Sequence, residues 1–424
     1  MNETSKPLEY AILTGVHTGG DPLNDTTEES IEELKRLADT AGATVVGTLI
    51  QNRESPENST YLGEGKLLEL KLASEELGAN LVIFDDELSP MQIRNIEREV
   101  GLRVIDRSML ILDIFASRAL SAEGKIQVEL AQLKYSMPRL SGLGKDLSRL
   151  GGGIGTRGPG ETKLETDKRH IRRKITHLTE ELSEIEKHRD LIRKRRKKDG
   201  RPVIAVVGYT NAGKSTLLNK LTGADAVAED KLFATLDPMV RGLTLPDGRE
   251  VLMSDTVGFI RKLPHHLIKA FKSTLDEAVL SDVLLIVADA SSDELSSHLD
   301  VVYNTLNDIG ASGKPTVCAF NKAELLEGNF EDKNKREENT VFISAKKGEG
   351  LDELLSLLDD VTPGKLKNVR MLIPYSEGSI LSELHRDGSV ISEDYTEKGT
   401  MVEAKVSAEN YRRLKDYILD YSGE

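Results

Sequence analysis

The residues best suited to chemistry lie in one glycine-containing segment, GYTNAGKS, at positions 208–215. It follows the apolar run VIAVV (203–207) and precedes a helix-like stretch, TLLNKL (216–221). The pattern G-x4-G-K-S between a buried strand and a helix is typical of a loop whose backbone N–H groups surround nucleotide phosphates. The sequence therefore predicts a phosphate-binding loop, and the N-terminal end of the helix adds its positive potential.

The residue types in this loop suit distinct tasks. Gly208 and Gly213 permit the tight turn that points backbone N–H groups at the phosphates. Lys214 is expected to reach the β- and γ-phosphates and to act in catalysis, and the Ser215 hydroxyl is expected to ligate Mg²⁺. The nucleotide-binding residues predicted here also include Tyr209, Thr210, Asn211, Ala212 and Thr216.

Segments further along the chain narrow the choice of nucleotide. The apolar strand-like run that begins at residue 251 ends in DTVG (255–258). Asp255 suits Mg²⁺ binding through a water molecule, and Gly258 can offer its N–H to the γ-phosphate. This arrangement is typical of a nucleoside triphosphatase.

The segment NKAE (321–324) points to guanine as the base. Glu324 would accept hydrogen bonds from both N1–H and N2–H₂ of guanine, a pair of donors that adenine lacks. Asn321 and Lys322 complete this guanine-reading segment. After another strand, FISAKK (342–347) adds the predicted base-binding residues Ser344, Ala345 and Lys346.

The predicted nucleotide-binding motifs each lie at the end of a predicted strand, and the sheet must bring them together. Strands and helices alternate between about residues 200 and 360, and each motif follows an apolar run. Because α/β sheets bind ligands at the carboxyl edge of their strands, all the motifs are expected to meet at one edge.

The first part of the chain shows the same alternation of strands and helices but contains no nucleotide-binding motif. Strand-like runs alternate with amphipathic helical stretches, at 11–15, 44–50, 81–84 and 102–105 for strands and 30–38, 66–74 and 91–97 for helices. This pattern predicts a small parallel sheet. Its first strand is followed by no phosphate-binding glycine pattern, so we assign it no chemistry.

Two long helical stretches follow and are expected to pack as an antiparallel hairpin. Ile126, Leu130, Leu133 and Met137 are spaced 4-3-4, which puts an apolar stripe on one face of the first helix. The second stretch continues this spacing over 171–192, with Arg189 as an interruption.

A glycine-rich insert at 141–163 separates the two helices and holds eight glycines between 142 and 160. Glycine lets the backbone approach a surface closely, and arginine can bind phosphate with two N–H groups. Basic runs at 168–174 and 193–198 lie nearby. We therefore predict RNA contact through Lys145, Arg149, Arg157 and Lys163, the alternative being a flexible loop beside solvated charges.

The overall formal charge of −14, from 57 Lys and Arg against 71 Asp and Glu, by itself argues against a nucleic-acid partner. The charges are segregated, however. Residues 139–201 contain 19 basic and 10 acidic side chains, a net charge of +9, and the other 361 residues carry −23. The acidic body is expected to confine RNA binding to the basic hairpin.

Composition excludes several classes of protein. No apolar run approaches 18 residues, so a membrane span is not expected, and the first residues lack the pattern of a signal peptide. The single cysteine, Cys318, cannot form an intramolecular disulfide and suits a cytoplasmic protein. Without Trp and with 4% aromatics, base-stacking platforms are not expected. The oligomeric state stays open.

The fold class expected is a multidomain α/β protein. It comprises an N-terminal α/β domain (1–118), the helical hairpin (119–199), a P-loop GTPase domain (200–361) with a mixed, mostly parallel sheet and helices on both faces, and a small C-terminal α+β domain (364–424). The last domain is expected to read strand 369–374, helix 377–387, strands 389–396 and 399–406, helix 408–420.

Taken in order, the motifs resemble the GTPase domain of translation-factor-class enzymes, and the insert GGGIGTRGPGETKLE (151–165) resembles that of the HflX family. The resemblance covers essentially the whole chain, and generic GTPases lack the insert. It implies hydrolysis of GTP to GDP and phosphate with Mg²⁺, and binding to the large ribosomal subunit. Members of the family are associated with splitting or rescuing stalled ribosomes.

The resemblance also implies roles for the switch residues. FATLD (233–237) resembles the first switch, in which Phe233 binds nucleotide and Thr235 senses Mg²⁺ and the γ-phosphate. The metal set is then Ser215, Thr235 and, through water, Asp255; Lys214, Thr235 and Gly258 form the catalytic set.

Two further positions matter by resemblance. Phe259 stands where Ras-like enzymes have a glutamine that orients water, so slow intrinsic hydrolysis and completion of the site by the ribosome are expected. Asn211 resembles the asparagine of potassium-stimulated GTPases, in which K⁺ takes the part of an arginine finger.

Other functions stay open at this point. The usual last residue of the guanine-reading motif is aspartate, and Glu324 keeps the acceptor but leaves exclusion of ATP uncertain. One alternative is an RNA- or ribosome-binding module whose nucleotide switch does not turn over. Another is an ATP-dependent RNA remodeller, although the sequence lacks a second motor core.

Overall fold

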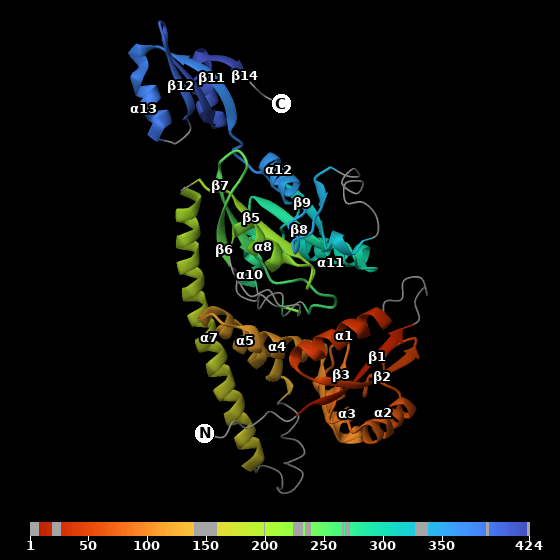
Figure 1. Ribbon diagram of the computed structural model, residues 1–424. Helices are drawn as coiled ribbons and strands as arrows, with labels where there is room; N and C mark the ends of the chain where they lie inside the picture. Colours follow the sequence, from red (N-terminus) through yellow and green to blue (C-terminus); the bar gives the residue numbers. More distant parts are fainter. Residues whose placement is uncertain are drawn as a thin grey trace, which may run out of the picture.

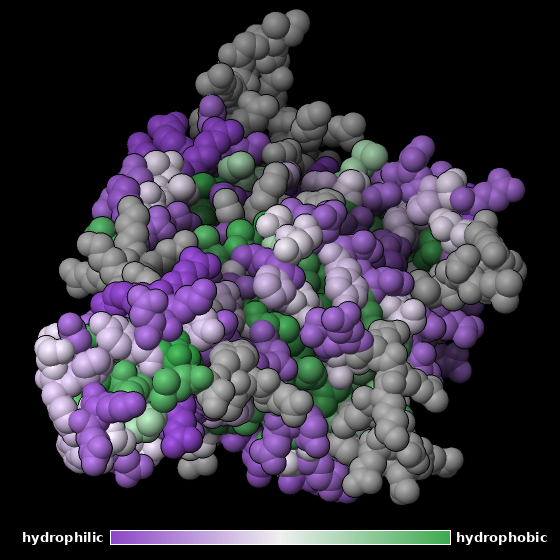
Figure 2. Space-filling view, turned by 90° about the horizontal axis from the view of Figure 1, so that it is seen from above, coloured by the Kyte–Doolittle hydropathy of each residue, from purple (hydrophilic) through white to green (hydrophobic). Residues whose placement is uncertain are grey.

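The computed structural model describes residues 8–18, 27–139, 159–198, 200–223, 232–233, 239–264, 267, 272–326, 338–386 and 390–421. Figure 1 shows the N-terminal sheet at one end of the molecule, the C-terminal sheet at the other, and the largest sheet between them. Within these ranges, no helix is both long and apolar enough to cross a bilayer. Figure 2 shows a mainly hydrophilic face on which hydrophobic side chains gather toward the middle.

The N-terminal sheet is parallel, with strand order β2-β1-β3-β4, and confirms the predicted βαβ pattern. Its strands are β1 (Tyr10–Thr18), β2 (Thr44–Arg53), β3 (Leu81–Phe84) and β4 (Arg103–Asp106). Its helices are α1 (Thr27–Ala41), α2 (Glu64–Leu77), α3 (Pro90–Val100) and α4 (Arg107–Arg118). Helices α1 and α4 cover one face, and α2 and α3 cover the other.

Helix α4 is an element that the sequence patterns do not predict. Asp106 ends β4 and caps the helix, because its Oδ1 accepts a hydrogen bond from the Met109 N–H at 2.9 Å. The helix is buried over most of its surface, including Leu110, Ile111 and Phe115. A helix buried on most sides has no polar face, so its 3.6-residue period is hard to detect.

The predicted helical hairpin is confirmed by α5 (Ala122–Ser136) and α7 (Pro159–Lys198). Their seam contains the buried residues Ile126, Leu130 and Leu178, with Leu133, Ile175, Leu182 and Ile185 packed around them. Helix α7 begins inside the predicted insert, where Pro159 suits the first turn of a helix. Lys163 therefore lies on this helix and not on a loop.

The central sheet has the order β10-β9-β8-β5-β7-β6, and only β6 runs antiparallel to its neighbour. Its strands are β5 (Val203–Gly208), β6 (Val240–Thr244), β7 (Glu250–Asp255), β8 (Val283–Asp289), β9 (Thr316–Asn321) and β10 (Thr340–Phe342). Helices α8 (Lys214–Thr222) and α12 (Leu351–Val361) cover one face, and α10 (Lys272–Leu280) and α11 (Leu295–Asp308) the other. The predicted mixed sheet with two covered faces is confirmed.

The C-terminal sheet is antiparallel, with order β12-β13-β11-β14. Its elements are β11 (Lys367–Ile373), α13 (Gly378–Arg386), β12 (Val390–Thr396), β13 (Gly399–Val406), α14 (Ala408–Arg413) and β14 (Ile418–Tyr421). The prediction of one helix over 408–420 is wrong in its second half. Residues of β14 pair with β11, as in Met371 with Ile418, so sheet pairing overrides the local helical pattern.

One hydrophobic core joins the N-terminal and central sheets. Phe115 of α4, Phe233, Phe259 and Leu306 of α11 are buried members of the same cluster. The rings of Phe115 and Phe233 meet edge to face, with centroids 4.7 Å apart. The phosphate-binding loop is therefore next to the N-terminal sheet and not separated from it by solvent.

Candidate nucleotide-binding site

The phosphate-binding loop requires glycine at both predicted positions. A Cβ on Gly208 would lie 2.1 Å from the Val287 carbonyl oxygen, and one on Gly213 would lie 2.3 Å from Asn321 Nδ2. Their φ angles of +151° and +90° are also strained for other residues. The backbone conformation of this loop thus follows directly from its two glycines.

Lys214 opens helix α8 and is buried inside the loop. Its Nζ donates to the carbonyl oxygens of Gly208 at 3.1 Å and Tyr209 at 2.8 Å. Burial lowers the pKa of Lys214 to about 8, and the nearby Asp255 partly offsets that effect. Phosphate groups beside the ammonium would favour its charged form.

Two of the three predicted magnesium residues, Ser215 and Asp255, lie in contact. Ser215 Oγ donates to Asp255 Oδ2 at 2.9 Å, and the other Asp255 oxygen accepts from the Thr256 N–H at 2.9 Å. Among the described residues, no group of three or more His, Cys, Asp or Glu could hold a metal by itself. A hydroxyl and a carboxylate beside nucleotide phosphates fit Mg²⁺, which prefers few protein ligands and keeps several waters.

The segment predicted to be the start of the second switch lies directly against the phosphate-binding loop. A Cβ on Gly258 would be 2.9 Å from Thr210 Cα and 3.0 Å from Lys214 Nζ. The Phe259 N–H donates to Gly208 O at 3.0 Å, and the Thr210 N–H donates to Phe259 O at 2.8 Å. The Phe259 ring is buried in the shared core, so it offers no hydrogen bond to an attacking water.

Asn321 ties three of the predicted segments together. Its Nδ2 donates to the Ala212 carbonyl at 2.8 Å, and its Oδ1 accepts from the Ala345 N–H at 2.9 Å. Lys322 follows with a left-handed φ of +62°, and its Nζ lies 2.7 Å from Asp289 Oδ2. The segments predicted to bind phosphate and base thus meet at one edge of the sheet.

Glu324 has an acceptor available for a ligand. Among the described residues, its Oε2 is buried and has no hydrogen-bond partner within the chain. A buried carboxylate oxygen without a donor is unfavourable, so a ligand that supplies N–H groups fits this position. Ser344 is buried and accepts from the Lys347 N–H at 3.1 Å, whereas Lys346 is exposed.

Several predicted site residues stay untested by these contacts. Thr235 lies outside the described residues, as do Lys145, Arg149 and Arg157. Phe233 is described and is buried against Phe115 with a left-handed φ of +56°, so its ring belongs to the shared core.

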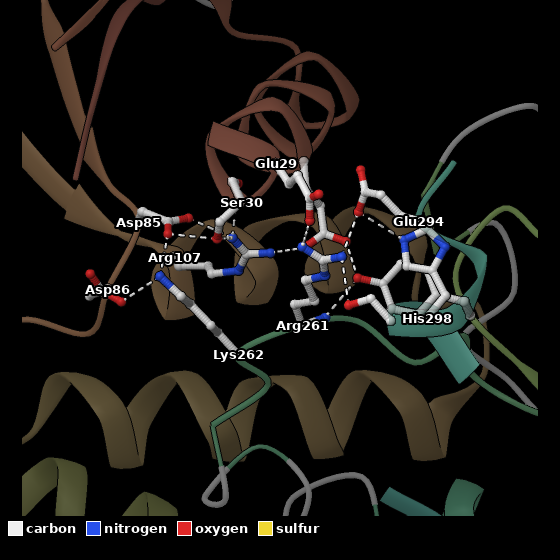
Figure 3. A network of polar contacts seen from close by, with 12 residues as sticks. Glu29, Ser30, Asp85, Asp86, Arg107, Arg261, Lys262, Glu294 and His298 are labelled. Carbon is white, nitrogen blue, oxygen red and sulfur yellow. Dashed lines mark hydrogen bonds and ion pairs between the residues drawn. The ribbon is translucent and has the colours of Figure 1, made fainter. Parts of the chain in front are cut away.

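A polar network on the N-terminal side of the site was not predicted (Figure 3). The Tyr209 ring stacks on His298 with centroids 3.9 Å apart, and its hydroxyl donates to Glu33 of α1. The Arg261 N–H in turn donates to the Tyr209 hydroxyl at 3.0 Å. Burial and the Arg261 charge lower the pKa of His298 to about 4, so the stacked imidazole is neutral at physiological pH.

The residues that follow Phe259 and Ile260 make the charged half of this network. Arg261 Nη1 lies 2.7 Å from Glu29 of α1, and its Nη2 lies 2.6 Å from Glu294. Lys262 Nζ lies 2.5 Å from Asp85 and 2.7 Å from Asp86, both beyond the end of β3. The segment predicted to be the second switch is thus followed by two residues that form ion pairs with the N-terminal domain.

Arg107 is the buried centre of the N-terminal side of the network. Its Nη1 lies 2.6 Å from Asp85 Oδ1, and its Nη2 pairs with Glu33. Burial would raise the pKa of Asp85, but Arg107 and Lys262 hold it below its usual range. The sequence carries a basic pair directly after DTVGFI, yet nothing local indicates which carboxylates it meets.

Arg139, which lies two residues before the glycine-rich insert, is held by several contacts. Arg139 stacks on the Tyr135 ring at 3.3 Å, and its Nη2 donates to Leu88 O at 3.0 Å and Asp106 Oδ2 at 3.1 Å. The Tyr135 hydroxyl donates to the same Asp106 oxygen. The chain therefore enters the insert from a point anchored on the N-terminal sheet.

The α5–α7 helical hairpin also contacts the central domain. Arg189, which interrupts the apolar seam, lies 2.7 Å from Glu123 of α5 and 3.0 Å from Glu277 of α10. Helix α10 follows the second switch in the chain. The basic hairpin is thus connected by an ion pair to α10, the helix that comes after DTVGFI in the chain.

The phosphate-binding loop, the Ser215–Asp255 pair and the guanine-reading edge define a P-loop GTPase. Three family descriptions match consecutive parts of the chain: GTP-binding GTPase N-terminal (28–116), GTP-binding GTPase Middle Region (118–196) and 50S ribosome-binding GTPase (203–322). The GTPase HflX of Caldanaerobacter subterraneus is 52% identical over 99% of this chain and 96% of its own length. The Escherichia coli GTPase HflX is 40% identical over 97% and 98%.

The chain therefore belongs to the HflX family of GTPases, and its reaction is the hydrolysis of GTP. A solved structure with a similar chain is a GDP-bound GTP-binding protein from Sulfolobus solfataricus, with 29% identity and a TM-score of 0.43. The match covers 84% of this chain and 98% of that protein.

Proposed function

We propose that the protein binds the large ribosomal subunit through its basic hairpin and uses GTP binding and hydrolysis to control that association. Splitting or rescue of stalled or idle ribosomes is the outcome that suits such a cycle, and a ribosomal partner implies a cytoplasmic protein. The match to a family described as 50S ribosome-binding GTPase supports this partner. So does the charge of +9 on residues 139–201, in a chain that is otherwise acidic.

The observation that carries the proposal is the ion-pair connection between the hairpin and α10, the helix that comes after the segment proposed as the second switch. Arg189 joins α5 to α10, and its side chain is largely buried between Glu123 and Glu277. A change in the second switch on nucleotide exchange would therefore move the basic hairpin or release it. RNA contact by Lys145, Arg149, Arg157 and Lys163 is part of this proposal.

For the chemistry, we propose in-line attack of water on the γ-phosphate. Lys214 and the backbone N–H groups of the loop stabilise the charge that develops on the phosphate oxygens, and the Gly258 N–H binds the γ-phosphate. Ser215, Thr235 and, through water, Asp255 would hold Mg²⁺, and the ion would supply positive charge that stabilises the charge on the phosphate. The buried Phe259 orients no water, so we expect the ribosome to complete the site.

The test is cosedimentation with ribosomes and with isolated subunits. We expect the protein to sediment with the large subunit in a non-hydrolysable GTP analogue and to be released in GDP. Replacing both Arg149 and Arg157 by serine should weaken this binding and lower the salt-dependence slope by about 2, because each removes one phosphate contact. GTP affinity should stay unchanged.

Matched replacement of Arg98 on α3 and Arg386 on α13, both exposed, serves as the control. Equal loss in the control, or equal sedimentation in GDP and in the analogue, would contradict the proposal. Phosphate release with and without ribosomes separates it from a switch that does not turn over. ATP-stimulated strand separation would instead favour the RNA remodeller.

We further propose that K⁺ stimulates hydrolysis through Asn211, an exposed loop residue with a left-handed φ of +62°. A cation held there would supply the positive charge of an arginine finger, so turnover in KCl should exceed turnover in NaCl about tenfold or more. An Asn211→Ala variant should bind GTP and lose this preference. Equal turnover of the unaltered protein in the two salts would refute the role.

A further inference from the structure

The β6–β7 hairpin lies between the two segments proposed as switches, and its strands are paired along their length. It begins just after the first switch, and its strands pair from Val240 with Ser254 to Thr244 with Glu250. At its base the Asp255 N–H donates to Met239 O at 3.0 Å, and the Asp255 carboxylate accepts from Ser215. At about 3.3 Å per residue, five pairs place the tip roughly 15 Å from the magnesium residues.

The tip of this hairpin is closed by its own hydrogen bonds. The Leu245 N–H donates to Arg249 O at 2.9 Å, and the Gly248 N–H donates to Leu245 O at 2.8 Å. Gly248 has a φ of +94°, and the Arg249 N–H donates to Asp247 Oδ1 at 2.9 Å. These hydrogen bonds close the turn at the end of the hairpin.

Arg249 fixes this tip to the end of the central domain. Its Nη1 donates to the carbonyl oxygens of Thr362 at 3.0 Å and Pro363 at 2.8 Å. Its Nη2 donates to the main-chain oxygen of Asp359 at 2.9 Å and to Oδ1 at 3.0 Å, and its Nε donates to Asp247 Oδ2 at 2.5 Å. All five N–H donors of the guanidinium are thus used.

The acceptors of Arg249 lie at a boundary in the chain. Asp359 and Thr362 belong to the C-terminal end of α12, whose free carbonyl groups Arg249 binds. Residues 363–366 then lead into β11. The same guanidinium therefore caps the last central helix and holds the first residues of the linker.

The C-terminal domain binds the same tip from its own side. Lys405 of β13 donates to Asp247 O at 2.6 Å, and the Leu366 N–H donates to Asp247 Oδ2 at 3.1 Å. The Asp247 and Arg249 side chains are only 8% and 9% exposed, so their contacts are shielded from solvent. Figure 1 shows the β6–β7 end of the central domain beneath the C-terminal sheet.

We propose that Asp247, Arg249 and Lys405 form a latch that makes the orientation of the C-terminal domain depend on the bound nucleotide. GTP binding displaces Asp255 at the base of the hairpin, and the paired strands carry the displacement to its tip. Because the tip is bonded to both the linker and β13, the C-terminal domain follows. Within the latch, Arg249 is a positioning residue, because it holds the hairpin tip against the linker. The inference rests on the GTPase cycle and is independent of the proposed RNA contact.

The test measures the distance between the two domains in the full-length chain. Cys318 is replaced by alanine, and probes are attached to cysteines at Ser312 in the central domain and Ser382 on α13, both exposed. We expect different probe distances in GDP and in a non-hydrolysable GTP analogue. Lys405→Met should reduce that difference by at least about half, and Lys398→Met, on the exposed β12–β13 turn, should leave it intact.

A second measurement uses the fact that coupling between nucleotide binding and domain orientation acts in both directions. A variant that uncouples the domains should change the ratio of GTP to GDP affinity by about three- to tenfold, because linkage acts equally in both directions. Arg249→Lys keeps the charge but not the five-donor geometry, so it should behave like Lys405→Met if the latch operates. Identical probe distances in the two nucleotides, or a full difference in both latch variants, would overturn the proposal.

Discussion

A Lys214→Ala variant is expected to bind GTP about a hundredfold more weakly than the unaltered protein. The ammonium is buried in the phosphate-binding loop, and in the complex it would pair with two phosphates. Loss of one partner from a buried, hydrogen-bonded charge pair costs about 3 kcal/mol or more, which corresponds to roughly two orders of magnitude in affinity. Titration of a fluorescent GTP analogue measures the change.

Lys220→Ala provides the matched control, because Lys220 lies on the same helix with an exposed side chain. The control should bind GTP normally. The Lys214 variant should retain part of its salt-sensitive affinity for RNA, since the basic hairpin is unaltered. A folded Lys214→Ala protein with unchanged GTP affinity would show that nucleotide binds elsewhere.

An Arg107→Met variant is expected to lose about 3–5 kcal/mol of stability in the N-terminal part of the molecule. The guanidinium is 2% exposed, and it faces Asp85 and Glu33, which are 1% and 12% exposed. Its removal leaves buried carboxylates without their main counter-charge, which is the costly way to break a buried ion pair. Urea unfolding followed by amide hydrogen exchange resolves this region from the others.

The pH dependence of this loss has a definite sign. Arg107 and Lys262 hold the pKa of Asp85 below its usual range, so their stabilising effect is present above about pH 4 and is lost as the pH falls. The difference between Arg107→Met and the unaltered protein should therefore be largest near neutral pH and should narrow in acid.

The control is Arg103→Met on β4, which removes a pair with Glu9 whose side chains are 49% and 44% exposed. Exposed pairs contribute about 0–1 kcal/mol, so this change should be small. Equal effects of the two substitutions would mean that the buried network does not stabilise the fold.

The nucleotide site was largely predictable because its signals are local. Gly208, Gly213 and Lys214 lie within seven residues, and the spacing itself specifies the loop. Asn321 ends β9 and Glu324 follows it, and the direction of this strand decides the edge at which they lie. The bond from Asn321 to Ala212 agrees with that expectation.

Contacts between distant parts of the chain were not predictable. Arg261 meets Glu29 across 232 residues, and nothing near either residue specifies the other. The strand β14 was not predicted for a similar reason. Only its pairing with β11, which is distant in the sequence, distinguishes it from the end of a helix. Helix α4 was missed for the opposite reason, since burial on most sides removes its polar face.

The core shared by the N-terminal and central sheets also has a consequence for biosynthesis. Phe115 is made early, whereas Leu306 of the same cluster emerges almost two hundred residues later. Phe233, which packs on the Phe115 ring, is made about 120 residues after it, so the apolar side of α4 lacks this partner in the meantime. At the usual elongation rate of about 5–20 residues per second, the growing polypeptide therefore exposes this hydrophobic surface for seconds. The nascent chain should therefore engage holding chaperones, and separately produced halves should aggregate unless they are mixed.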